Sequence, residues 1–349
     1  VIAQAAVAGG DNKTATATYK ILLQDPKTRF VGIHGLLKQK LQEEDFETAL
    51  KLATRAFALK PKHLETQDAL LKLQAGQKDW AGVRKTLNAK LKHGSLPRDV
   101  HRRRDGVFAL SQARELHAVG ELEAAHVKAI EANKLTPGLV SAAILTSQGY
   151  LEKDKPKLAA KTLRAAWSIE PHPELAAGFA AIISNETPIE RLDRFLSLTK
   201  IAPSHPETKM LIAELNIAAE QFDQARLEMG DLASTDPTMR SLTIMAAIEQ
   251  GEGGDDQSVR EILTDALSAQ RDPQWVCDNC GNISHEWEAV CVSCETIDSV
   301  SWKRPPASDV ISSKMLPLII GQTFPGDKDI DKLFRDNSNM DGVKRSILI

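Results

Sequence analysis

The sequence contains little cysteine, few aromatic residues and no large excess of either charge. Four of its 349 residues are cysteine, 5% are aromatic, and the formal net charge is −3. Proteins that bind nucleic acid or anionic membranes usually carry a basic excess, so this balance argues against both partners. Alanine and leucine are abundant, and such a composition favours helices over strands. We therefore expect an all-α protein that binds no nucleic acid.

Long apolar runs are missing as well. A transmembrane helix needs about 18 consecutive apolar residues. The best candidate, MLPLIIG from Met315, is far shorter and contains a proline. The sequence begins at Val1 rather than at methionine and shows no signal peptide. We expect the natural N-terminus to lie upstream of Val1, so that any membrane anchor there is outside this chain.

Catalytic signatures are also absent. The sequence has no phosphate-binding loop, no dinucleotide-binding glycine pattern, no HExxH zinc-protease motif and no GxSxG nucleophile turn. The stretch HEWEA at His285 begins like a zinc-protease motif, but Ala289 stands where the second histidine belongs. We therefore predict that the chain is not an enzyme.

A regular series of prolines is present. They recur at intervals of 32 to 40 residues, at Pro26, Pro61, Pro97, Pro137, Pro171, Pro203, Pro237 and Pro273. Tetratricopeptide (TPR) repeats have a period of about 34 residues and end in a proline. That proline ends the second helix, because it has no N–H group and clashes with the preceding turn. The spacing predicts TPR-type helix pairs across residues 1–273.

Small residues test this prediction independently of the prolines. A TPR needs small side chains where its two helices cross closely. Repeats that begin at Phe30, Gly106, Val140 and Pro206 place small residues at those crossings. They are Ala49, Ala56, Ala113, Ala125, Ala132, Ser147, Ala159, Ala166, Ala213 and Ala225. We expect a TPR superhelical solenoid of about seven repeats, the first truncated, whose neighbours cover one another's apolar faces. The alternative is an unrelated helical bundle with scattered prolines.

The four cysteines fall in one window, WVCDNCGNISHEWEAVCVSC, with the spacing CxxC-x10-CxxC: Cys277, Cys280, Cys291 and Cys294. Two such pairs can place four thiolates in a tetrahedron, as in structural zinc sites and rubredoxin-type iron sites. We predict one structural metal ion, with zinc favoured over iron, in a small zinc-ribbon or rubredoxin-like module at residues 274–304. Gly281 suits the tight turn that follows the first pair, whereas Glu295 predicts a less regular turn after the second.

Two other uses of the cysteines are disulfide bonds and dithiol redox chemistry. Disulfides need an oxidising compartment, yet the 276 residues before the first cysteine contain none. A dithiol redox site needs one CxxC pair on a βαβ frame rather than two matched pairs. Four cysteine ligands leave no coordination position for a substrate, so we expect the metal to stabilise the module rather than to catalyse a reaction.

The cysteine module is acidic. Between Trp275 and Trp302 it has no lysine or arginine, and its acidic residues are Asp278, Glu286, Glu288, Glu295 and Asp298. Such a surface repels phosphates, which argues again against nucleic acid. We expect the module to contact a protein, or to dock on the repeats of its own chain.

Cationic side chains define the predicted partner-binding surface. TPR arrays bind extended peptides along the first helices of their repeats. On the early repeats that face carries His34, Lys38, Lys72, Arg114 and His117. A basic run, RDVHRRRD, adds Arg102, Arg103 and Arg104 just before the helix expected to carry Val107. We expect this run to be either a solvated loop between repeats or a contact for an acidic partner.

The last residues, 305–349, combine proline, glycine, serine and mixed charges with weak periodicity. We expect an extended or disordered tail there, in which MLPLII docks on the solenoid.

The combination of TPR-like repeats, the cysteine window and the following DSVSWKRPP resembles the HemY family of α-proteobacteria. The stretch LLQDPKTRFVGIHGLLKQKLQEEDFETALKLATRAFALKP also resembles the early repeats of that family. The resemblance covers most of residues 1–305. It implies a non-enzymatic scaffold anchored in the inner membrane through upstream helices, with its array facing the cytoplasm. It also implies association with the enzymes of late haem biosynthesis.

A second resemblance is to LapB-type regulators of lipopolysaccharide synthesis, which also join TPRs to a rubredoxin-like module behind a membrane anchor. In those proteins the module lies against the repeats, and the array recruits a membrane protease and its substrate. This resemblance implies the alternative function of a regulatory adaptor.

Overall fold

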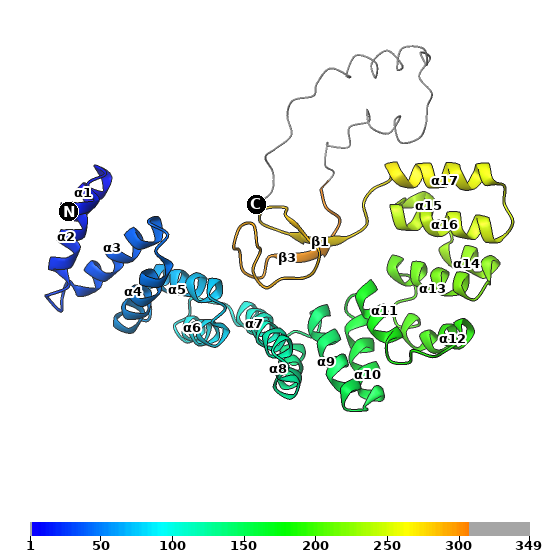
Figure 1. Ribbon diagram of the computed structural model, residues 1–349, viewed down its shortest axis with the longest axis horizontal. Helices are drawn as coiled ribbons and strands as arrows, with labels where there is room; N and C mark the ends of the chain where they lie inside the picture. The colour runs from blue at the N-terminus through cyan, green and yellow to red at the C-terminus, as the bar shows by residue number, and fades with distance from the viewer. Residues whose placement is uncertain (1, 307–349) are drawn as a thin grey trace, which may run out of the picture. The chain divides into compact units, whose positions relative to one another are not determined.

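The computed structural model describes residues 2–306, which form seventeen helices and three short strands (Figure 1). Residues Val1–Pro305 make up one compact unit. The predicted tail, including MLPLII, lies outside the described residues. No helix of the described part combines the length and the apolar character that crossing a bilayer requires.

The helices follow one another as antiparallel pairs. The first four pairs are α1 (Ile2–Ala8) with α2 (Asn12–Leu22), α3 (Arg29–Gln42) with α4 (Phe46–Leu59), α5 (Leu64–Gly76) with α6 (Trp80–Lys92), and α7 (Arg98–Ala118) with α8 (Leu122–Leu135). The next are α9 (Val140–Glu152) with α10 (Pro156–Trp167), α11 (Pro173–Ala180) with α12 (Pro188–Thr199), α13 (Pro206–Ala218) with α14 (Phe222–Met229) and the short α15 (Leu232–Thr235), and α16 (Met239–Gly251) with α17 (Asp256–Ser268). Each proline of the series lies after the last helix of one of these units and before the first element of the next, so the proline series marks the repeat boundaries.

The turn between the two helices of a pair has a recurring geometry. In every pair except α11–α12, the second residue after the first helix adopts a positive φ, as at Glu44 (56°), Lys78 (57°) and Gly120 (83°). This left-handed residue ends the helix and lets the chain reverse. An N-cap often follows it, and the side chain of Asp45 accepts a hydrogen bond from the Thr48 N–H group (3.2 Å). The cap supplies a partner for one of the free N–H groups at the start of the second helix.

The predicted helix crossings are confirmed. All ten small residues that mark them are buried, and none is more than 3% exposed. Small side chains let the two helices approach closely and bury their apolar faces against neighbouring pairs. The units near Leu64, His172 and Leu242, whose sequences match the pattern less well, are also helix pairs, although α11 has only 8 residues. The described helices therefore form a TPR-type solenoid.

The basic run differs from the prediction. Instead of a loop before the helix, the run forms the first turns of α7, which begins at Arg98 and has 21 residues. Pro97 takes the N-cap position, and Asp99 places a negative charge in the first turn. Acidic residues are favourable at this end of a helix, and this one offsets part of the unfavourable effect of the arginines.

Three short strands form the sheet of the cysteine module. They are β1 (Gln274–Cys277), β2 (Ile283–Ser284) and β3 (Val300–Lys303), in the antiparallel order β2-β1-β3. Trp275 pairs with Ser284 on one side and with Trp302 on the other. That the array (1–273) and the module (274–304) are separate folding units remains a proposal.

Candidate metal centre and its contact with the repeats

The two CxxC pairs form matching turns. After the first pair, Gly281 has a φ of 73° and its N–H group donates to the carbonyl of Cys277 (2.9 Å). After the second, Glu295 has a φ of 56° and its N–H group donates to the carbonyl of Cys291 (2.9 Å). The expectation of a less regular second turn is therefore wrong. Glu295 adopts the left-handed conformation that glycine adopts in the first turn, at a cost of about 1–2 kcal/mol.

This difference between the turns gives a prediction. Glu295→Gly should stabilise the metal-bound module by up to about 1 kcal/mol, because strain is relieved while some backbone entropy is lost. Gly281→Ala should destabilise it by about 1–2 kcal/mol, since alanine would be forced to a positive φ. Chelator competition on the two variants measures both effects. Ser293→Gly, in the same hairpin, is the control. A weaker metal affinity in Glu295→Gly would contradict the strain argument.

The four cysteine sulfurs converge on one point. All of them lie within 4.8 Å of one another. The Sγ atoms of Cys277 and Cys294 are 3.7 Å apart, as are those of Cys280 and Cys291. A tetrahedron with metal–sulfur bonds of about 2.3 Å has edges of about 3.8 Å. A disulfide bond would need sulfurs about 2.05 Å apart. The four thiols are thus free and placed to bind one metal ion.

The four ligands differ in their surroundings. Cys277 and Cys291 are buried, Cys294 is partly exposed and Cys280 is exposed. A hydrogen bond with the Thr296 hydroxyl is the main cause that lowers the pKa of Cys294 to about 5. Burial raises the pKa of the Cys291 thiol to about 11. Metal binding must therefore displace a proton from Cys291, and the affinity for metal should fall as the pH is lowered.

The module shares its apolar core with the central repeats. Trp275, Trp287 and Val300 are at most 5% exposed and belong to the same buried cluster as Leu110 of α7 and Leu175 of α11. So short a module could not bury this much apolar surface alone. The sequence left two roles open for the module, contact with another protein and docking on the repeats of its own chain. The structure shows the docking.

Polar contacts fix the module to α7 and α11. Arg103 donates to the carboxylate of Asp298 (3.0 Å). Arg114 donates to the carbonyl of Trp287 (2.8 Å), and its guanidinium lies 5.5 Å from the centre of that ring. The indole N–H of Trp275 donates to Glu174 at the start of α11 (3.0 Å). The opposite charges of the basic run and the acidic module are the sequence signal for the Arg103–Asp298 contact, whereas no sequence signal indicated the other two contacts.

A buried histidine completes this contact. His172 is fully buried, with its ring centre 4.2 Å from that of Trp302 and 5.2 Å from that of Trp275. Its Nδ1 atom accepts from the N–H group of Glu174 (3.1 Å), so it caps α11. Burial lowers the pKa of His172 to about 4. It therefore packs against the module as a neutral ring at neutral pH.

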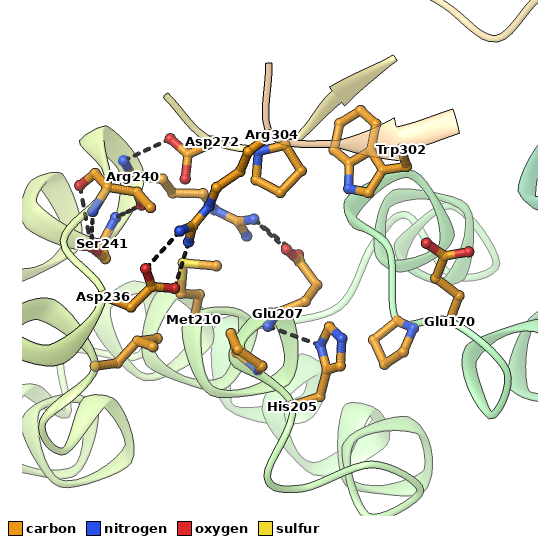
Figure 2. A pocket seen from close by; sticks show the side chains of 15 residues that line it. Glu170, His205, Glu207, Met210, Asp236, Arg240, Ser241, Asp272, Trp302 and Arg304 are labelled. Atoms are coloured by element: carbon orange, nitrogen blue, oxygen red, sulfur yellow. Dashed lines mark hydrogen bonds and ion pairs between the residues drawn. The ribbon is translucent and has the colours of Figure 1, made fainter. Parts of the chain in front are cut away.

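A cavity of about 260 Å³ lies where the end of the module meets the last repeats (Figure 2). Arg304, just after β3, donates to Asp236 (2.6 Å). Arg240 of α16 donates to Glu207 (2.7 Å), and burial raises the pKa of Glu207 to about 7 despite that arginine. The backbone N–H of Arg240 also donates to Asp272, just before β1 (3.0 Å). The Arg304–Asp236 ion pair and the hydrogen bond from Arg240 to Asp272 hold the two ends of the module beside α16.

The predicted partner-binding residues on the early repeats lie on two helices. On α3, Lys38 is 2.9 Å and His34 is 3.3 Å from the carboxylate of Glu65. Burial lowers the pKa of His34, so this ring is neutral at neutral pH. On α5, Lys72 is exposed and has no ion pair within residues 2–306. The structure therefore brings Lys38 and His34 together around an acid, which reduces the free positive charge there.

The remaining predicted residues all lie on α7. Arg102 donates to the carbonyl of Leu135 (2.9 Å) and so stabilises the C-terminal end of α8, where a cation is favourable. Arg103 and Arg114 contact the module. Arg104 is partly exposed and His117 is exposed.

Comparisons with known proteins identify one curated relative. No family model matches the chain. Over 150 residues the chain is 29% identical to the probable magnetosome protein Mms48 of Magnetospirillum gryphiswaldense. The alignment covers 42% of this chain and 33% of that protein, so the chain matches about a third of the length of its relative.

Solved structures with similar chains include several TPR proteins. The TPR domain of P58(IPK) aligns with 76% of this chain and 95% of its own length, at 15% identity and a TM-score of 0.25. YrrB, described as a TPR protein with an unusual peptide-binding site, aligns with 56% and 97%, at 13% identity and a TM-score of 0.32. The Naa15/Naa10 structure with HypK-THB aligns with 76% and 45%, at 15% identity and a TM-score of 0.38. These scores are low, so the assignment of the repeats rests on the helix pairs and buried crossings of this chain.

The chain is a TPR-type helical-repeat protein with a four-cysteine module.

Proposed function

We propose that this protein is a non-enzymatic scaffold that binds other proteins through the first helices of its repeats. The observation that carries the proposal is the pairing of a TPR-type array with a metal site whose four ligands are all cysteines of the chain. Such a site has no open position for a substrate. Zinc is the favoured ion, and iron the alternative, because four thiolates accept both.

The resemblance to the HemY family supports a finer proposal. The scaffold would act at the inner membrane, held by an anchor upstream of this chain, with the repeats on the cytoplasmic side. Its partners would be enzymes of late haem biosynthesis. The alternative is a LapB-like adaptor that recruits a membrane protease and its substrate in lipopolysaccharide synthesis. The packing of the module against α7 and α11 favours this alternative, since LapB-type proteins share that arrangement.

A pull-down from membranes with the anchored, full-length protein distinguishes these proposals. Recovery of late haem-pathway enzymes supports the first, and recovery of a membrane protease with a lipopolysaccharide enzyme supports the second. Turnover of a tetrapyrrole by the isolated chain would contradict the scaffold proposal.

The early repeats give a prediction about the partner surface. Replacing both Lys38 and Lys72 with alanine should weaken binding of an acidic partner by up to about thirtyfold, because each of the two exposed contacts contributes roughly 0–1 kcal/mol. The slope of affinity against salt should also become shallower, since fewer charges take part. Titration of the captured partner at several salt concentrations measures both quantities. The matched control is Lys51→Ala with Lys85→Ala, which removes the same charge from the exposed faces of α4 and α6. Equal affinities in the two double variants would show that the partner binds elsewhere.

A further inference from the structure

The cationic face of α7 is covered by a part of its own chain. Arg103 and Arg114 are eleven positions apart, which is about three helical turns, so they lie on one face of the helix. Both arginines are bound to the module. In a TPR-type array this helix is the first of its pair, and the faces of first helices are the ones that we propose bind partners.

The contacts on α7 show which chemistry this face recognises. Arg103 binds a carboxylate, that of Asp298. Arg114 binds the backbone carbonyl and the ring face of Trp287, and its guanidinium is 3.6 Å from the carboxylate of Glu286. Guanidinium groups bind carboxylates and aromatic faces well. An acidic segment that carries a tryptophan, such as the module's own Glu-Trp-Glu at 286–288, therefore fits this face.

The contacts that close this face of α7 depend on the fold of the module. The Arg114–Glu286 pair has side chains 36% and 68% exposed, and exposed ion pairs of this kind contribute little. Trp287 is positioned by the core that it shares with the cysteines. Modules of this size usually unfold without their metal. Loss of the metal would then remove Trp287 and Asp298 from α7 together.

We propose that the face of α7 around Arg103 and Arg114 is a second partner-binding surface, specific for an acidic segment with a tryptophan, and that the metal-bound module keeps it closed. This proposal rests on the proposed scaffold function and adds its regulation. When the module holds its metal, partners bind only the early repeats. When the metal is lost, the face of α7 opens to an acidic protein segment.

A labelled synthetic peptide tests the proposal on the full chain. The probe is Ser284–Val290, SHEWEAV, and its control is the same peptide with both glutamates replaced by glutamine. The metal-loaded protein should bind the probe at least about tenfold more weakly than Cys280→Ser does, because the folded module holds Trp287 and Asp298 against α7 together, whereas the unfolded segment competes only from a flexible tether. Val292→Ser, at a 72% exposed position beside Cys291, is the matched control and should behave like the native chain.

Two further variants make the result specific. Adding Arg103→Ala and Arg114→Ala to Cys280→Ser should abolish the gain in probe binding. The double variant Asp298→Asn with Glu286→Gln keeps all four cysteines and weakens only the contacts of the module with α7. Its affinity for the probe should therefore rise. The control is Asp278→Asn with Glu295→Gln, whose affinity for the probe should not rise. Circular dichroism verifies that the helices persist in each variant. Equal probe binding by the loaded native chain and Cys280→Ser, or a gain that survives loss of both arginines, would overturn the proposal. If membrane pull-downs recover no partner while the probe binds as expected, the proposed scaffold function is contradicted and the proposed binding surface on α7 is supported. If partners are recovered and the affinity for the probe does not depend on the metal, the scaffold function is supported and the proposal of a metal-closed surface on α7 is contradicted.

Discussion

Cys280→Ser is expected to abolish metal binding and to unfold the module while leaving the helical array assembled. Serine cannot replace a thiolate in a four-sulfur site, and a structural metal supplies most of the folding free energy of so small a module. The far-UV circular dichroism signal should persist, because all helices of the described residues end by Ser268. Repeats are stabilised mainly by their neighbours, which also favours a surviving array.

The array should nevertheless lose stability in this variant. Trp275 and Trp287 share a core with α7 and α11, so unfolding the module exposes apolar surface of the central repeats. The midpoint of the helical thermal transition should fall by about 2–4 °C for each kcal/mol lost. Val292→Ser should retain both the metal and the midpoint. A collapse of the whole helical signal in Cys280→Ser would show that the module is an obligatory part of the array, and that the boundary at residue 273 is wrong.

Ala159→Leu is expected to destabilise the array by about 1–3 kcal/mol, because three additional carbon atoms must enter a filled helix crossing. Ala159 lies on α10 and is fully buried. Ala165 lies on the same helix and is exposed, so Ala165→Leu is the matched control and should change stability by less than about 0.5 kcal/mol. Urea denaturation followed by circular dichroism measures the difference. Equal midpoints for the two variants would contradict the close crossing that defines the repeat.

The helix pairs could be predicted from the sequence because their determinants are local and periodic. Proline ends a helix wherever it falls, and a close crossing requires a small side chain such as Ala49 or Ala132. The cysteine site could be predicted for a similar reason, since the spacing of two CxxC pairs fixes the ligand set. Both signals lie within one repeat or one hairpin.

The contact between module and repeats could not be assigned in the same way. Arg103 and Asp298 are 195 positions apart, and no local pattern links them. Opposite charges indicated that docking was possible, but not which arginines would be used. The sequence does not predict the start of α7, because a run of cations is unfavourable at a helix N-terminus. Tertiary contacts of Arg102 with α8 and of Arg103 with the module offset that cost.

The central claim is that four cysteines hold one metal ion and that this ion keeps the module folded on the repeats. Elemental analysis combined with X-ray absorption on freshly purified, reduced protein tests it most directly. We expect about one zinc or iron per chain, with four sulfur ligands at about 2.3 Å. Removal of the metal by a chelator should increase proteolytic cleavage within residues 274–304. Protein that contains no metal, or a metal with fewer than four sulfur ligands, would contradict the claim.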